Sequence, residues 1–326
     1  MCRSVADYRR AAEWTVAAAA WCERQAITGF PGVCRVQRAE IMRLRGEFSQ
    51  AEDEARRAQT ELTAFGRLPQ AGAGAYEIGE VRLRLGDLDG AEKAFGAAHQ
   101  LGHEPHPGLA LVYLARGRTE AARSSIATAL ADAFDPLHRA RLLAARVEIA
   151  LAGHDIADAR AAAGELGEIA SRYDSPMLHA MAHQTNGATL TYEDEPTPAI
   201  VELRKAVRAW TEMDAPFESA KTRRLLALAH RFSGDEASAG MELRVAKESF
   251  ERLGAALEAN RCDELSNAWE EGDGRRARQS RFEIVSPYCG KYWLIMPRSN
   301  EARMSSLGSH SRRNLKLAST SSARLA

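Results

Sequence analysis

Three histidines near residue 100 have a spacing that could hold a metal ion. His99 and His103 are four residues apart and would share one face of a helix, and His106 follows closely. Zinc sites in proteins usually combine three or four His, Cys or carboxylate ligands. No carboxylate or cysteine with a clear ligand spacing joins this group. We therefore interpret the histidines as polar residues near a helix C-terminus, where an imidazole gains from the helix dipole.

A second histidine pair, His179 and His183, has the spacing of the HExxH motif of zinc proteases. In that motif the glutamate directly after the first histidine acts as the general base. Here that position is Ala180, so the base is missing. The sequence therefore predicts no zinc protease at this pair.

Three glycines in the stretch AGAGAYEIGE, namely Gly72, Gly74 and Gly79, loosely match a dinucleotide-binding loop. No strand precedes them, and a lone glycine pattern is a weak signal. The chain also lacks a phosphate loop, a nucleophile elbow and a pair of carboxylates that stands out from the charged background. We therefore expect a non-enzymatic protein with no catalytic residue, no cofactor and no metal. A pocket with strongly perturbed ionisable groups would favour an enzyme instead.

The composition indicates which elements carry these residues. Ala, Leu, Arg and Glu dominate, and aromatic residues make up only 6% of the 326 residues. Side chains of these four types lose little entropy in a helix, so the composition favours helices over strands. With 45% hydrophobic residues, the chain can bury a sizeable core.

A glycine that ends one helix and opens a turn recurs along the chain. The five glycines of this kind are Gly46, Gly86, Gly117, Gly153 and Gly234. Their intervals are 40, 31, 36 and 81 residues, and the last interval covers about two repeats. The skipped turn is expected near residues 193–195, where Thr197 and Pro198 would start a new helix.

Small residues keep a fixed register relative to four of these glycines. Alanine stands five and twelve residues later, and a small residue stands seven residues earlier. The alanines after the glycines are Ala51, Ala58, Ala91, Ala98, Ala122, Ala129, Ala239 and Ala246. The small residues before them are Ala39, Gly79, Ala110 and Ala227. Small side chains allow two helices to cross closely, so we expect these positions to pack the repeats together. Gly153 fits this register poorly, with Arg146 before it and Asp158 after it.

The repeat register resembles that of the tetratricopeptide repeat. Three segments carry a narrower resemblance: GFPGVCRVQRAEIMRLRGEFSQAEDEARRA, AYEIGEVRLRLGDLDGAEKAF and PGLALVYLARGRTEAARSSI. Over about residues 4–260 the chain resembles the repeat region of large actinobacterial regulators of the LuxR type. The resemblance implies an all-α, tetratricopeptide-like α-solenoid of stacked antiparallel helix pairs with an irregular C-terminal tail. It also implies a sensory or partner-binding role.

Two departures from that family limit the expected function. No phosphate loop marks an ATPase module, and the helix-turn-helix expected after about residue 265 is not recognisable. We divide the chain into a helical repeat domain at residues 1–271 and a basic, Ser- and Arg-rich tail at residues 272–326. The tail holds 11 Lys and Arg against 3 Asp and Glu, and its composition predicts disorder.

We hypothesise that the tail is the decayed or frame-shifted end of a longer regulator. Its basic residues could contact phosphates, but without a folded reader such binding would not be sequence-specific. These residues are Arg275, Arg276, Arg278, Arg312, Arg313 and Lys316. Sequence-specific DNA binding by this chain is therefore not expected.

The expected partners are a protein or peptide, or a small effector, held in the grooves of the repeats. Trp14, Trp21 and Trp210 are interpreted as core or groove aromatics. The basic residues of one early helix spread around it and are interpreted as a solvated, salt-bridged surface. They are Arg35, Arg38, Arg43 and Arg45. The alternative hypothesis is a free-standing scaffold or adaptor with no transcriptional role.

The cysteines and apolar runs indicate the compartment. Five dispersed cysteines without CxxC spacing argue against a disulfide framework and a zinc site. No apolar run is long enough to span a bilayer, and the N-terminus has no apolar signal core. We therefore expect a cytoplasmic protein without membrane contact.

Overall fold

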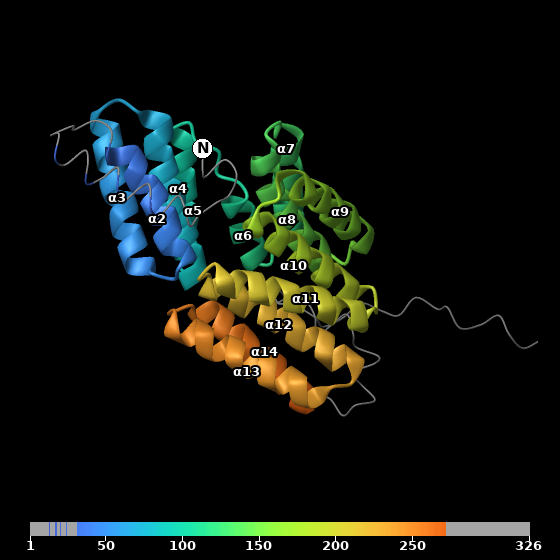
Figure 1. Cartoon of the computed structure of the whole chain (residues 1–326). Helices are drawn as coiled ribbons and strands as arrows, with labels where there is room; N and C mark the ends of the chain where they lie inside the picture. Colours follow the sequence, from blue (N-terminus) through green and yellow to red (C-terminus); the bar gives the residue numbers. More distant parts are fainter. Residues whose placement is uncertain (1–12, 14–16, 18–19, 21–23, 25–30, 272–326) are drawn as a thin grey trace, which may run out of the picture. The chain divides into compact units, whose positions relative to one another are not determined.

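The computed structural model describes residues 31–271 and the single residues Glu13, Ala17, Ala20 and Arg24. All of them belong to the compact unit Met1–Gly290. Residues 31–271 form thirteen α-helices, and this stretch contains no strand, so the predicted all-α class is confirmed (Figure 1). The helices are α2 (Pro31–Leu44), α3 (Phe48–Ala64), α4 (Leu68–Leu85), α5 (Leu88–Gln100), α6 (Gly108–Ala115), α7 (Thr119–Ala131), α8 (Pro136–Ala152), α9 (Ile156–Tyr173), α10 (Pro176–Tyr192), α11 (Pro196–Glu212), α12 (Pro216–Ser233), α13 (Glu236–Arg252) and α14 (Ala256–Glu271). Trp14, Trp21 and the predicted tail at residues 272–326 lie outside the described residues.

The helices are arranged so that each packs against the next one in the chain. In addition, each even-numbered helix from α2 to α10 contacts the following even-numbered helix. Two further contacts join helices far apart in sequence, because α12 touches α2 and α14 touches α4. The even-numbered helices therefore form a layer of their own that closes upon itself.

Left-handed residues end most of the helices. Gly46, Gly86, Gly117 and Gly234 all have φ between 73° and 86°. Glycine adopts this conformation without the steric penalty that a Cβ brings. At Gly46, Gly86 and Gly234 the following N–H bonds back to the helix, as in Glu47 N–H to the Met42 carbonyl at 2.9 Å. Each of these turns thus reverses the chain over a very short stretch.

Gly153 differs from the prediction, because its φ is −88° and the left-handed residue is His154, with φ of 58°. The turn lies one residue later than the glycine pattern indicated. Counted from His154, the positions seven before and five after are Val147 and Ala159, both buried apolar residues. The repeat pattern fits poorly at Gly153 because the turn, and the buried apolar residues around it, lie one residue later than that glycine predicts.

The left-handed positions reveal a longer regularity than the glycines alone. Nine of the eleven left-handed positions among the described residues fall at 46, 66 and 86 and at 154, 174, 194, 214, 234 and 254, so the interval within each series is constant. Gly102 and Gly117 lie between the two series and do not follow this interval. Asp174, Asp194 and Asp214 occupy three of these positions. Aspartate tolerates the left-handed region better than most residues, because its short polar side chain can bond to the nearby backbone. One helix pair therefore spans two such intervals over most of the described chain.

The turn that the glycine pattern skipped lies at Asp194, and α11 begins at Pro196. The same register of small residues surrounds it. Ala199 and Ala206, five and twelve residues later, are fully buried. Gly187, seven residues earlier, faces Leu203, and an added Cβ would lie 2.6 Å from the Leu203 Cγ. The unit is a full member of the series with aspartate in place of glycine.

The small residues of the predicted register are buried at the helix crossings. Apart from Ala129, which is slightly exposed, all the register alanines have no exposed surface. At Gly79 a Cβ would lie 2.6 Å from the Phe95 Cε1 atom, so α4 and α5 approach too closely for any side chain there. The largest apolar cluster joins α6 to α10 and includes Ile126, Leu143 and Leu166.

Candidate ligand-binding cavity

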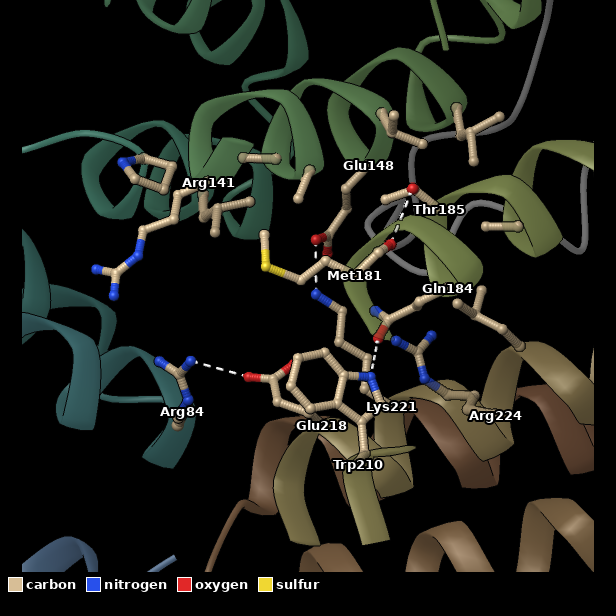
Figure 2. Close-up of a pocket in the computed structure, with 18 of the residues that line it drawn as sticks. Arg84, Arg141, Glu148, Met181, Gln184, Thr185, Trp210, Glu218, Lys221 and Arg224 are labelled. Atoms are coloured by element: carbon tan, nitrogen blue, oxygen red, sulfur yellow. Dashed lines mark hydrogen bonds and ion pairs between the residues drawn. The ribbon is translucent and has the colours of Figure 1, made fainter. Parts of the chain in front are cut away.

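A cavity of about 210 Å³ lies among the even-numbered helices. Every helix of that layer from α2 to α12 contributes side chains to its wall, together with Trp210 of α11. Figure 2 shows side chains from α4, α8, α10 and α12 directed toward this common space. The closing contacts between α12 and α2 are therefore what brings the first and last of these helices to one site.

One part of the wall is apolar. Leu44, Met177, Met181 and Trp210 belong to one cluster that joins α2, α10 and α11. Leu225 and Leu228 of α12 also line this part of the wall, as does Tyr192 at the end of α10. Methionine is flexible and polarisable, so it can fit ligands of irregular form. This part of the wall suits the hydrocarbon body of a small molecule.

The other part of the wall is a set of ion pairs that link helices across the cavity. Arg84 of α4 binds Glu80 at 2.6 Å and reaches Glu218 of α12 at 3.0 Å. Lys221 of α12 binds Glu148 of α8 at 2.6 Å (Figure 2).

Two further pairs extend this set. Arg141 of α8 pairs with Glu40 of α2. Arg43 of α2 binds Glu77 of α4 at 2.7 Å. A second cavity of about 80 Å³ is bordered by some of the same residues, including Arg84, Glu218 and Lys221.

The ion pairs keep most of these groups charged. Burial would raise the pKa of Glu80, but Arg84 and Arg43 outweigh it and lower that pKa to about 2. Burial would lower the pKa of Lys221, but Glu148 and Glu218 outweigh it and raise that pKa. Glu77 is the exception, because its burial outweighs Arg43 and raises its pKa.

Arg224 of α12 stands apart from the other cations of the wall. Its side chain is only 2% exposed, and its Nη2 donates to Glu258 Oε2 at 3.1 Å. Its Nε and Nη1 atoms are buried and have no hydrogen-bond partner among the residues that the structure describes. An unpaired buried donor costs about 1–3 kcal/mol, and more when it is charged. Such a group is unusual in a folded protein and calls for an explanation.

Gln184 of α10 is a second fixed donor in the wall. Its Oε1 accepts from Trp210 Nε1 at 2.8 Å and from Thr222 Oγ1 at 2.9 Å. These two bonds use the oxygen and fix the orientation of the amide. The NH₂ group of Gln184 therefore remains as the donating end.

The structure places the predicted histidines at separate points. The His103 ring packs against Tyr76 at 5.6 Å, whereas His106 binds Glu104 and Ser125. The rings of His179 and His183 stack at 6.5 Å, but their partners differ, since His179 binds Asp174 and His183 binds Glu202. Within the described residues, no group of three or more His, Cys, Asp or Glu side chains could hold a metal ion.

The glycines of AGAGAYEIGE lie inside α4 rather than in a loop. A Cβ at Gly72 would lie 2.6 Å from the His103 Cβ, and one at Gly74 would lie 3.0 Å from the Ala55 carbonyl oxygen. These glycines allow close contact of α4 with its neighbours and bear no relation to a phosphate-binding turn.

The early arginines correct one expectation. Arg35 and Arg38 are half-buried and both pair with Glu54, and Arg45 is exposed. Arg43, however, is buried between α2 and α4, so its interpretation as a solvated residue was wrong. It lies on the face of α2 that turns toward α4, where Glu77 and Glu80 compensate its charge. Trp210, expected in the core or a groove, is buried and lines the cavity.

Sequence reasoning missed the residues that make the cavity polar. Lys221, Arg224, Leu225 and Leu228 follow at three- and four-residue steps, so one face of α12 mixes cations with leucines. The signal in the sequence that could have indicated the cavity was the presence of charged residues on a helix face that is otherwise apolar. The ion-pair partners of Lys221 and Arg224 are Glu148 of α8 and Glu258 of α14, and these cannot be assigned from local sequence because they lie on other helices.

Comparison of the chain with protein-family models finds no match, and comparison with curated proteins finds none either. Among the described residues, no helix combines the length and the apolar character needed to cross a bilayer. Cys34 and Cys262 are buried and belong to no disulfide, and burial raises the pKa of Cys262 to about 11.

Proposed function

We propose that this chain is the ligand-binding region of a transcriptional regulator of the LuxR type, built from tetratricopeptide-like repeats. Its ligand is a small organic effector that occupies the cavity among the even-numbered helices. The observation that carries this proposal is the cavity itself, which has an apolar wall, fixed donors and a buried cation with unused N–H groups. Ligand sites commonly combine a mostly apolar lining with a few fixed polar groups.

The repeat architecture supports the family part of the proposal. Helix pairs of constant length, small residues at the crossings and contacts between alternate helices are typical of helical repeat proteins. One repeat unit covers two consecutive intervals between turns, for example from Gly46 to Gly86. This unit is longer than the roughly 34 residues of a regular tetratricopeptide repeat. The resemblance of residues 4–260 to the repeat region of LuxR-type regulators adds the regulatory role.

The charged groups favour binding over catalysis. General acid–base catalysis works best with a pKa close to the operating pH. Here the Glu80 pKa is low and the Lys221 pKa is raised, so both groups hold their charge near neutrality. Such groups can orient a ligand but are poorly suited to exchange protons with it.

The closing contacts favour a small effector over an extended peptide. The Arg84–Glu218 and Lys221–Glu148 pairs cross the space that a peptide would follow along the even-numbered layer. A peptide would have to break these partly buried pairs and leave their charges without partners, which costs free energy. A molecule that fits beside them avoids that cost.

The direct test is retention of a small molecule by the full chain. We expect equilibrium dialysis against a mixed metabolite library to identify at least one retained compound. The variant Ala144→Phe, which fills the cavity, should abolish retention, whereas Ala161→Phe on the exposed face of α9 should not. Retention of nothing, or equal retention by both variants, would contradict the proposed function.

The regulatory role makes a separate prediction about DNA. We expect no sequence-specific complex between the full chain and promoter DNA in a gel-shift experiment, because the expected reader helix is not recognisable in the sequence. A shifted band that survives competition by unrelated DNA would contradict this.

The alternative is a scaffold that binds proteins through its outer surface. Val201 of α11 and Met241 of α13 are both about half exposed. They occupy equivalent positions of successive repeats, because they follow the turns at Asp194 and Gly234 by the same number of positions. A scaffold would lose its partners after Val201→Glu and Met241→Glu. An effector-binding protein would keep its small ligand in the same double variant.

A further inference from the structure

The cations of the cavity wall differ in how fully their charge is compensated. Arg43 has two close carboxylates, Glu77 and Glu80, and Arg84 likewise has Glu80 and Glu218. Arg224 has one close carboxylate, Glu258. It is therefore the least compensated of these three arginines.

Glu258 is itself shared. Arg261 binds its Oε1, Arg224 binds its Oε2, and Lys221 adds a further positive charge nearby. Together these cations outweigh burial and lower the pKa of Glu258. Glu258 is thus shared among three cations, so it compensates the charge of Arg224 only in part.

In this part of the cavity wall, the unused hydrogen-bonding groups are donors rather than acceptors. Among the described residues that line the cavity, the buried side-chain atoms without a hydrogen-bond partner are the Nε and Nη1 atoms of Arg224. The NH₂ of Gln184 lies on the neighbouring helix α10, and Figure 2 shows Gln184 and Arg224 on the same side of the cavity. A ligand that satisfies this wall must bring an acceptor, and a negative charge fits it best.

The rest of the wall limits the size and character of the ligand. Met181, Tyr192, Leu225 and Leu228 offer apolar contacts. A cavity of about 150 Å³ in another protein is known to hold benzene, with six carbons, so one of 210 Å³ takes at least about eight non-hydrogen atoms. The body of the ligand is therefore a short alkyl chain or a single ring.

We propose that the cavity binds a small monocarboxylate with an apolar body, whose carboxylate accepts from Arg224 and from the amide of Gln184. This assignment deepens the effector-binding function proposed above and depends on it. Arg224 lines the cavity, and its two unpaired nitrogens are buried next to it, so a group that enters the cavity could satisfy them after a small movement of the Arg224 side chain.

The test uses three probes with the same eight-carbon chain and different head groups: octanoate, octanol and octylamine. Binding to the full chain is measured by isothermal titration calorimetry. Octanoate should bind at least about tenfold more tightly than octanol, because a hydrogen bond to a charged group contributes about 1.5–3 kcal/mol. Octylamine should bind most weakly. Equal binding of octanoate and octanol would overturn the proposal.

Two substitutions assign the head group to its donors. Arg224→Met should reduce octanoate binding to the level of octanol and leave octanol unchanged. Arg223→Met is the matched control, because Arg223 is the adjacent arginine and pairs with Glu242 away from the cavity wall. If Arg223→Met weakened octanoate as much as Arg224→Met, the assignment would be wrong.

Gln184→Glu provides a second test if Arg224→Met does not fold, which circular dichroism would show. The glutamate keeps an oxygen for Trp210 and Thr222 but replaces the free NH₂ by an anion. It should abolish octanoate binding and improve octylamine binding, and unchanged preference would contradict the proposal. If no eight-carbon probe binds while library compounds are retained, the carboxylate assignment fails and effector binding stands. If nothing binds, both fail.

Discussion

The α2–α4 contact and the α7–α9 region solve the same packing problem with different residues. Between α2 and α4 the chain buries Glu40, Arg43, Glu77 and Glu80. From α7 to α9 the helices are instead held together by an apolar cluster that includes Leu142 of α8 and Leu166 of α9. Replacing a buried ion pair by apolar residues is often neutral or stabilising, so the charges near α2 are not needed for folding alone. The difference indicates that the charged contact serves the cavity that it borders.

The largest expected effect is from breaking the charged contact on one side only. Arg43→Met would leave Glu77 and Glu80 with fewer partners and should lower the free energy of unfolding by about 4 kcal/mol. The double variant Arg43→Met, Glu77→Leu should recover most of that loss, as measured by urea denaturation. If the double variant were less stable than Arg43→Met, the charges would be a requirement of the fold.

The apolar region should respond through cavity formation. Leu166→Ala removes a fully buried side chain from α9 and should cost about 3 kcal/mol. The same denaturation experiment measures this. No second substitution in a charged partner should rescue it, and a rescue of that kind would show that the two regions are not packed differently.

Acid should weaken the charged region in particular. The pKa of Glu80 is lowered in the folded chain from 4.5 to about 2. Its stabilising contribution is therefore present above pH 4.5 and is lost as the pH falls toward 2, by about 3 kcal/mol at most. Unfolding followed between pH 6 and 2.5 should show a shallower decline in Glu80→Gln than in the native chain. The exposed control Glu264→Gln should follow the native profile.

The smallest effects concern glycine. Gly79→Ala would place a Cβ 2.6 Å from Phe95 and should destabilise the fold by about 2 kcal/mol. Gly164 of α9 has nothing within 4 Å, so Gly164→Ala should stabilise its helix by about 0.5–1 kcal/mol. Thermal denaturation of the two variants should therefore shift in opposite directions. Shifts of the same sign would mean that the crossing at Gly79 is looser than its geometry indicates.

The sequence predicted the helical class and four turn glycines because these depend on local preferences. It missed the turns at Asp174 and Asp214 because aspartate is common elsewhere in helices and loops, whereas a glycine stands out. The turn at Asp194 was predicted near residues 193–195 from the repeat interval and the helix start that follows it. The sequence placed one turn at Gly153, one residue too early, because this glycine directly precedes the left-handed residue His154.

The candidate site was much less predictable. The Arg84–Glu218 pair joins residues 134 positions apart, and the Lys221–Glu148 pair joins residues 73 positions apart. A local pattern contains no information about which distant helices meet. Trp210 could be recognised as a core or groove residue, but its bond to Gln184 could not.

The contacts of α12 with α2 and of α14 with α4 have a consequence for unfolding. In an open row of repeats each unit depends only on its neighbours, so the end units can fray first and separately. Here the helices near both ends of the described stretch hold one another in place. Damage to α14 should therefore increase amide exchange in α4, and the whole array should melt as a single cooperative block.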